Sequence, residues 1–360
     1  MSKLTNTALK TSIQALRFLE RVIWKLERHL EPPAIKQTST SAAQPTPIEA
    51  NNMLYKQLEF LPSVAGTHTF QTETYKQAFR WLEERGVHLT PNHFYYPIPD
   101  TRLLMQSKLW DKESELPGVD MNLPTQLYFL RDVFPGLVDE YNAIPKSKTP
   151  DLKKYEFHFN NNIFDEIDPY VYYGMIRHFR PKTVLEVGSG WSTRLAARAA
   201  LKNGDTRLVS IEPYPDFLLK AGFPGLHSLI EQKVEDVDLS VFQQLDENDI
   251  LFIDTSHVVR TGGDVNYLYL EVLPRLHKGI VVHIHDIFFP EEYPRWWITE
   301  RFLFWNEQYL LQAFLAFNSH FKVQFANNYM RLKYLDEVKN AFPNSPSYEH
   351  GQSLWMQKVK

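Results

Sequence analysis

The chain has 360 residues, with 39 Lys and Arg against 43 Asp and Glu, and no cysteine. Its formal charge of -4 provides no basic surface of the kind that nucleic-acid binding needs. The lack of cysteine excludes disulfide bonds and thiolate zinc sites. No apolar stretch is long enough for a transmembrane helix, and the N-terminus lacks the pattern of a signal peptide. We therefore expect a cytoplasmic protein with one core domain of about 200 residues and smaller additions.

Residues 1–31 carry a seven-residue apolar repeat. One inward-facing position of the heptad is occupied by Leu9, Leu16, Ile23 and Leu30, and the other by Ser12, Leu19 and Leu26. This repeat predicts an amphipathic helix. The helix would pack on the body, self-associate as a coiled coil in a homo-oligomer, or rest on an anionic membrane through its basic outer face. Residues 32–49 are rich in Pro, Ser and Thr, which predicts a disordered linker.

Residues 50–164 show no regular alternation of strand and helix, and we interpret them as an irregular cap and substrate region. Helices are predicted over 73–85 and roughly over 123–142. Between them, residues 91–100 contain three prolines, which exclude a regular element and favour an extended path. This aromatic segment would either cover a pocket or pack around the core.

Regular alternation begins at residue 168. The predicted strands cover 183–187, 207–212, 227–234, 249–254 and 279–285, and the predicted helices cover 168–179, 192–203, a short stretch near 216, and 264–276. A helix near 299–317 and strands over 320–327 and 353–358 follow. The strands are rich in Val, Ile and Leu with little alternation, as expected for parallel strands covered on both faces. Residues 165–360 are thus predicted to form a Rossmann-like, doubly wound α/β sheet.

A tight glycine turn follows the first predicted strand. Gly188 and Gly190 allow the chain to reverse and a ligand to approach the backbone, while Ser192 or Thr193 can cap the next helix. A nicotinamide site would favour a third glycine where Thr193 stands. The turn alone is compatible with several nucleotide cofactors.

Acidic residues gather around this turn, at the carboxyl ends of the strands, where open α/β sheets bind ligands. Glu212 follows the second strand and would accept the ribose hydroxyls of S-adenosylmethionine. Glu235 and Asp236, placed at the end of the third strand, would stand near the adenine edge. Glu186 would orient the loop and face the cationic methionyl end. The predicted cofactor-binding set is Glu186, Gly188, Ser189, Gly190, Ser192, Glu212, Glu235 and Asp236.

Several segments together resemble the class I S-adenosylmethionine-dependent methyltransferases. They are 186–190, 253–257, 262–264, 283–290 and 305–309. More narrowly, the chain is similar to the metal-dependent O-methyltransferases that act on macrolide sugars and in bacterial polysaccharide pathways. The class-level resemblance spans about 165–335 and implies a seven-stranded, mostly parallel sheet that ends in an antiparallel pair.

The ends of the fourth and fifth strands carry the catalytic hypothesis. Asp254 and His257 straddle the end of one, and His285 and Asp286 end the other. Methyl transfer to a hydroxyl needs a positioned acceptor oxygen and removal of its proton. We assign His257 as the base, and Asp254 and Asp286 as ligands of a divalent cation that acidifies the hydroxyl. His283 is interpreted as a core residue.

The resemblance implies the same roles, with one departure. The macrolide-sugar enzymes have a carboxylate ligand where this chain has His285. The predicted metal set is therefore Asp254, His285 and Asp286, holding Mg²⁺ or, because manganese accepts nitrogen more readily, Mn²⁺.

The sequence thus predicts an S-adenosylmethionine-dependent O-methyltransferase acting on a sugar hydroxyl of a glycan, nucleotide sugar or glycosylated metabolite. Two alternatives remain open: a nicotinamide-dependent oxidoreductase, and a non-catalytic S-adenosylmethionine-binding protein that assembles partners through residues 1–31. The polar run 306–308 interrupts an aromatic segment and would either point into the active site or tie its helix to the cap.

Overall fold

The computed structural model describes residues 73–88 and 90–360. The chain divides into two compact units, of which the first ends at Pro91 and the second begins at Asn92. The described part of the first unit contains α4 (Glu73–Glu83) and the turn that follows it. The ring of Phe79 in α4 stacks on that of His88 beyond the turn, with centroids 5.4 Å apart. The predicted helix 73–85 is confirmed and ends two residues early. The predicted helix 1–31 and linker 32–49 lie outside the described residues.

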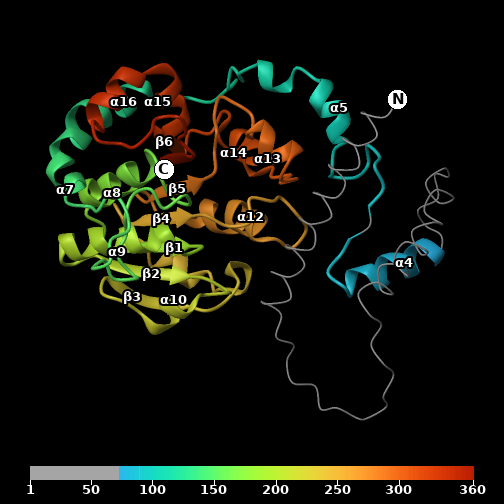
Figure 1. The fold of residues 1–360 in the computed structure, drawn as a ribbon, viewed down its shortest axis with the longest axis horizontal. Helices are drawn as coiled ribbons and strands as arrows, with labels where there is room; N and C mark the ends of the chain where they lie inside the picture. Colours follow the sequence, from blue (N-terminus) through green and yellow to red (C-terminus); the bar gives the residue numbers. More distant parts are fainter. Residues whose placement is uncertain (1–72, 89) are drawn as a thin grey trace, which may run out of the picture. The chain divides into compact units, whose positions relative to one another are not determined.

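The second unit is built on a seven-stranded sheet with the order β3-β2-β1-β4-β5-β7-β6 (Figure 1). The strands are β1 (Thr183–Val187), β2 (Arg207–Ile211), β3 (Leu226–Ile230), β4 (Ile250–Ile253), β5 (Val281–His285), β6 (Phe321–Ala326) and β7 (Ser353–Lys358). Strands β1 to β5 pair in parallel, and β7 runs antiparallel between β5 and β6. The predicted Rossmann-like, doubly wound sheet with a final antiparallel pair is confirmed.

Helices cover both faces of this sheet, so alternate residues of one strand enter two different cores. In β4, Ile250 and Phe252 join the core beneath α8 and α9, whereas Leu251 and Ile253 join the core beneath α12 and α14. The first face carries α8 (Asp168–Phe179), α9 (Trp191–Asn203), α10 (Phe217–Ala221), α15 (Asn327–Lys333) and α16 (Leu335–Ala341). The second carries α11 (Ser240–Gln243), α12 (Asp264–Tyr267), η5 (Leu268–Val272), η6 (Leu273–Arg275) and α14 (Glu307–Leu315). This double burial explains the unbroken apolar runs of the central strands.

The segment before the sheet contributes side chains to the core of the second unit. Its elements are α5 (Thr101–Gln106), η1 (Leu109–Asp111), α6 (Leu123–Tyr128), η2 (Phe129–Val133), η3 (Phe134–Leu137) and α7 (Val138–Asn142). Phe134 and Phe159 are buried in the same core as α8. In contrast, Phe94 and Tyr95 are more than 80% exposed, and their rings lie tilted against each other with centroids 4.4 Å apart. The aromatic segment 91–100 therefore keeps these two rings out of the core.

Two predicted elements are wrong in extent. Strand three stops at Ile230, because it lies at the sheet edge and is followed by the exposed polar run 231–233; Val234–Asp236 forms the separate 3₁₀ helix η4. The helix predicted near 299–317 is divided into α13 (Arg295–Thr299) and α14, with a non-helical stretch between them. Phe302 in that stretch has a positive φ of 57°, which a continuous right-handed helix cannot contain.

Prolines also shape two predicted helices. The helical path over 123–142 tightens into a 3₁₀ turn at Pro135, and the path over 264–276 does so at Pro274. Proline lacks the backbone N–H that a regular helical turn needs. Helices α5, α15 and α16 have no counterpart in the sequence prediction. Among the described helices, none combines the length and apolar character that crossing a membrane requires.

Candidate active site

The glycine turn after β1 packs directly against the ends of two neighbouring strands. Gly188 has a φ of 85° and donates its backbone N–H to Ile211 O at 3.0 Å. A Cβ atom at this position would stand 1.7 Å from the backbone oxygen of Asp254. Only glycine therefore permits this approach of β1 to β4.

Thr193 occupies the place of a third glycine and has its own structural role. Its Oγ1 accepts the backbone N–H of Gly190 at 2.8 Å, and its side chain is fully buried at the start of α9. The hydroxyl thus satisfies a backbone donor where the chain enters the helix.

The glycine turn borders a pocket of about 300 Å³ at the carboxyl ends of β1, β2 and β4. Its lining comprises Val187, Gly188, Ile211, Glu212, Pro213, Tyr214, Lys233, Val234, Glu235, Asp254, Thr255, Ser256, Arg260 and Asp264. Glu212 accepts the backbone N–H groups of Ser189 at 3.2 Å and Tyr214 at 2.8 Å. These bonds hold its carboxylate at the pocket wall.

Not every predicted cofactor residue lines this pocket. Gly188, Glu212 and Glu235 do, whereas Ser189, Gly190 and Ser192 belong to the turn and helix beside it. Asp236 is exposed and outside the lining, because the chain has already turned into η4.

Glu186 lies fully buried beneath the turn. Burial raises the pKa of its carboxyl to about 8, against the opposing effect of hydrogen bonds from Thr193 and Ser192. Within the described part of the chain, its Oε1 atom and the Ser189 hydroxyl have no hydrogen-bond partner. Glu186 is not part of the pocket lining. A buried carboxyl with an unpartnered oxygen is unusual in a core, because burying an unsatisfied polar atom costs free energy.

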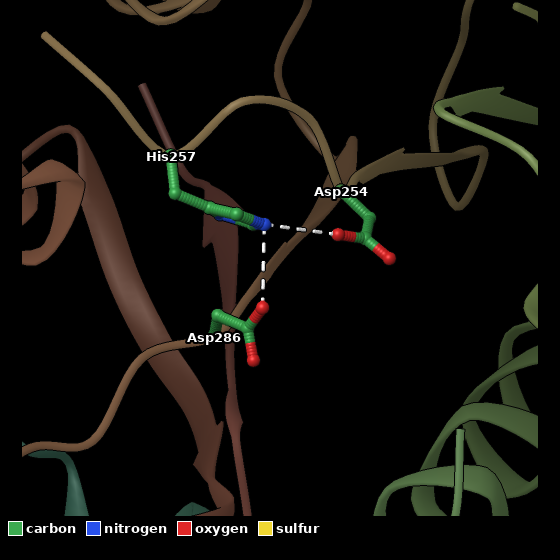
Figure 2. Close-up of side chains that lie close together, drawn as sticks. All are labelled: Asp254, His257 and Asp286. Carbon is green, nitrogen blue, oxygen red and sulfur yellow. Dashed lines mark ion pairs between the residues drawn. The ribbon is translucent and has the colours of Figure 1, made fainter. Parts of the chain in front are cut away.

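A histidine and two carboxylates meet at the rim of the pocket. His257 Nε2 lies 3.2 Å from Asp254 Oδ1 and 3.3 Å from Asp286 Oδ2 (Figure 2). In the figure the imidazole ring points between the two carboxylates, which come from the ends of β4 and β5. Their potential ligand atoms all lie within 4.8 Å of one another, a spacing that suits a metal ion. The pairing of β4 with β5 brings together the residues that the sequence predicted.

Glu307 completes this cluster and was not predicted as a site residue. Its Oε2 accepts a hydrogen bond from His257 Nδ1 at 2.9 Å, and its side chain is fully buried. The backbone N–H groups of Asn306 and Glu307 both donate to His257 O, at 3.0 and 3.2 Å. The polar interruption 306–308 was the only signal of this role in the sequence. Glu307 contacts His257, whereas the binding of a polar acceptor by this run stays a prediction.

Two members of the cluster adopt left-handed backbone conformations. His257 has a φ of 57° and Asp286 a φ of 54°. Such conformations are costly for residues other than glycine and are found where the surrounding structure enforces them, often at functional sites. The local backbone thus aims both side chains at one point.

The charges in the cluster shift its pKa values. Burial by itself lowers the pKa of His257, but the carboxylates of Asp254, Glu307 and Asp286 outweigh it and hold that pKa well above its usual value. Burial raises the pKa of Asp286 to about 6. The pKa of Asp254 is lowered, because the effects of His285 and His257 exceed that of burial. The site therefore favours a protonated imidazole between ionised carboxylates.

His285 and His283 lie outside the close group. His285 Nε2 is 4.0 Å from Asp286 Oδ1, and His285 does not belong to the set of close ligand atoms. His283 stacks on Phe252 with ring centroids 4.1 Å apart, in the core position expected for it.

Two sequence comparisons relate the chain to other proteins. Residues 185–287, which include the glycine turn, Asp254, His257 and Asp286, match a family model described as a methyltransferase domain. Residues 185–287 of this Rossmann-like fold are thus similar in sequence to a methyltransferase domain. The chain belongs to the same family as an uncharacterized protein of Archaeoglobus fulgidus, which is 35% identical over 173 residues, or 46% of this chain and 77% of that protein.

Solved structures are more distantly similar. The O-methyltransferase TomG from Streptomyces achromogenes, solved with S-adenosylmethionine, is 15% identical with a TM-score of 0.34, covering 71% of this chain and 95% of its own. CmcI-N160 in its apo form is 16% identical with a TM-score of 0.34, covering 62% of this chain and 84% of its own. Similarities this low carry no argument about substrate or mechanism.

Proposed function

We propose that this protein transfers the methyl group of S-adenosylmethionine to a hydroxyl group of a sugar, carried on a glycan, a nucleotide sugar or a glycosylated metabolite. The observation that carries the proposal is the position of Asp254. Its side chain lines the pocket beside the glycine turn and also contacts His257. A cofactor in the pocket and an acceptor at His257 would thus meet at one carboxylate.

The residues around the pocket fit S-adenosylmethionine. Glu212 would accept the ribose hydroxyls, while Glu235 would stand at the adenine edge. Glu186 would face the cationic methionyl end, where its unpartnered Oε1 supplies a buried negative charge once ionised. The cofactor has a sulfonium and an ammonium group but no phosphate, so a pocket with four lining carboxylates suits it better than it suits a dinucleotide. The methyltransferase match likewise disfavours a nicotinamide-dependent oxidoreductase.

His257 would remove the proton of the acceptor hydroxyl. Only the neutral imidazole can do this: its hydrogen bond from Nδ1 to Glu307 keeps a proton on that nitrogen, and its Nε2 lone pair is the acceptor. Because the neighbouring carboxylates raise the pKa of His257, we expect this neutral form to become more populated as the pH rises. The imidazolium formed by proton transfer would be stabilised by Glu307 on one side and by Asp254 and Asp286 on the other. This arrangement uses a carboxylate to orient a histidine base, as hydrolase triads do.

Asp254 and Asp286 would hold Mg²⁺ or Mn²⁺, because their oxygens converge and hard cations prefer oxygen ligands. Such a cation would supply Lewis acidity that lowers the pKa of the acceptor hydroxyl. His285, the third ligand expected from the sequence, would join only if the Asp286 side chain turned toward it. His257 Nε2 is nearer, but one nitrogen cannot bind the cation and accept the proton at the same time.

Replacing His257 by Ala tests this division of roles. We expect methyl transfer from radiolabelled S-adenosylmethionine to a sugar panel to fall by about 10²–10⁴-fold, the usual contribution of a general base. Binding of S-adenosylmethionine and of Mn²⁺, measured by calorimetry, should stay within about twofold, since Asp254 and Asp286 remain. Intact turnover would disprove the base assignment, and loss of Mn²⁺ binding would make His257 a ligand instead. Transfer to other acceptors but to no sugar would contradict the substrate class.

A further inference from the structure

The second unit contains a second pocket, whose lining shares no residue with the pocket beside the glycine turn. It measures about 560 Å³ and is bounded by three segments: residues 104–114, the stretch after β5, and α14. Its lining comprises Leu104, Ser107, Lys108, Leu109, Lys112, Glu113, Ser114, Phe289, Pro290, Glu291, Glu292, Gln308, Tyr309 and Gln312. The volume is within the range of sites that bind small molecules.

The pocket lining includes residues that follow two cluster residues along the chain. Gln308 directly follows Glu307, the partner of His257, and its Oε1 accepts the backbone N–H of Phe288 at 3.2 Å. Phe288 is in turn two residues beyond Asp286. The backbone that positions the two cluster residues therefore continues directly into this pocket.

The outer wall is fastened to the same unit. Trp110 Nε1 donates to Tyr293 O at 2.8 Å, and the backbone N–H of Ser114 donates to Pro290 O at 2.8 Å. These bonds join residues far apart in sequence, so the 104–114 segment forms a fixed side of the pocket.

The carboxylates of the pocket are already paired within the protein. Glu113 accepts from Lys333, and Glu291 pairs with Arg331 at 3.2 Å. Glu292 accepts the hydroxyl of Tyr309 at 2.6 Å. The negative charges in the lining are thus satisfied without a ligand.

The two lysines of the lining differ from its carboxylates in their side-chain contacts. Neither Lys108 nor Lys112 has a side-chain hydrogen bond or ion pair with any residue of 73–88 or 90–360. Their ammonium groups add positive charge to a pocket that also contains the apolar side chains of Leu104 and Phe289. A ligand that matches this lining would combine an anionic group with a less polar body.

We propose that this pocket binds a phosphate or carboxylate group of the methyl acceptor through Lys108 and Lys112. The inference rests on the proposed function, and it narrows the acceptor to an anionic sugar. The sugar ring would lie in the pocket with its apolar face toward Phe289. A charged hydrogen bond from each lysine would favour the anionic acceptor over its neutral analogue.

The test is the double variant Lys108→Ala/Lys112→Ala, with glucose 1-phosphate and galacturonate as anionic probes and glucose and galactose as neutral ones. For the full chain saturated with S-adenosylhomocysteine, calorimetry should give at least about tenfold tighter binding of an anionic probe than of its neutral analogue. The double variant should lose this preference. Lys146→Ala/Lys148→Ala removes the same charge from exposed lysines outside the pocket and should retain it.

Equal binding of anionic and neutral probes by the unmodified protein would overturn the inference. A double variant that keeps the preference would overturn it too. Binding of S-adenosylmethionine to the same variant separates the two proposals, because the lysines are not in the cofactor pocket. Lysine-dependent anion binding in a protein that transfers no methyl group would uphold the pocket and contradict the proposed function.

Discussion

His257 is held at both ring nitrogens, and this double contact limits what the residue can do. Nδ1 bonds to a fully buried carboxylate, and Nε2 faces two more at the rim of the pocket. A buried histidine with three carboxylate neighbours and a left-handed backbone conformation is typical of functional sites. The geometry therefore supports a chemical role for the imidazole, with Glu307 as the residue that positions it.

The change Glu307→Gln tests that positioning role. Glutamine keeps the shape and can still accept from Nδ1, but it lacks the negative charge that stabilises the imidazolium. We expect kcat to fall by roughly 10–100-fold, as for other residues that support a site histidine, while the KM for S-adenosylmethionine stays unchanged. Steady-state kinetics measures both.

Glu140→Gln is the matched control, because Glu140 also accepts hydrogen bonds from a neighbouring side chain, that of Arg177 at 2.8 Å, but belongs to α7, outside the site. It should reduce stability and leave kcat intact. A similar fall of kcat in both variants would show that Glu307 acts through general stability alone.

The sequence predicted Asp254, His257 and Asp286 because each follows a recognisable strand end. Glu307 could not be placed in the same way. It is the first residue of α14 and follows an aromatic segment, 50 residues beyond its partner, and no local period links the two. His285 illustrates the opposite case: it is adjacent to Asp286 in sequence, yet the alternation of side chains along β5 directs it to the other face of the strand.

At the scale of elements, the contact between the glycine turn and β4 joins the two halves of the site. Gly188→Ala should destabilise the fold by at least roughly 3 kcal/mol, because the new Cβ would overlap the Asp254 backbone and the residue has a positive φ. Urea denaturation followed by circular dichroism measures the change. Gly136→Ala is the control, since a Cβ at Gly136 meets nothing within 4 Å. Equal stability of the two variants would refute the close approach.

Element boundaries were predictable where burial fixed them. The bounds of the central strands β1, β4 and β5 match the prediction within two residues. Helices cover both faces of these strands, so each strand is an apolar run whose ends can be recognised in the sequence. At the sheet edge, β3 has only one neighbour and partly exposed residues, so its sequence gives a weak end signal. Between α13 and α14, aromatic spacing resembles a helical period although the rings pack in a loop.

At the scale of the whole molecule, the alternation of strands and helices was enough to predict the doubly wound sheet, and the resemblance added the antiparallel end. The helices α15 and α16, which follow β6 along the chain, were not predictable, because their apolar residues do not repeat over a long enough stretch at helical spacing. The oligomeric role of residues 1–31 and the domain boundaries 1–31, 32–49, 50–164 and 165–360 remain predictions. Residues 92–164 belong to the same compact unit as the sheet.

The central claim is that the pocket beside Gly188 and Glu212 binds S-adenosylmethionine. Isothermal titration of the full chain with S-adenosylmethionine and with NADH tests it most directly. We predict binding of one S-adenosylmethionine per chain and no saturable binding of NADH. The Glu212→Gln variant should bind S-adenosylmethionine at least about tenfold more weakly, because it loses charged hydrogen bonds to the ribose. Saturable NADH binding without S-adenosylmethionine binding, or unchanged affinity in Glu212→Gln, would contradict the account.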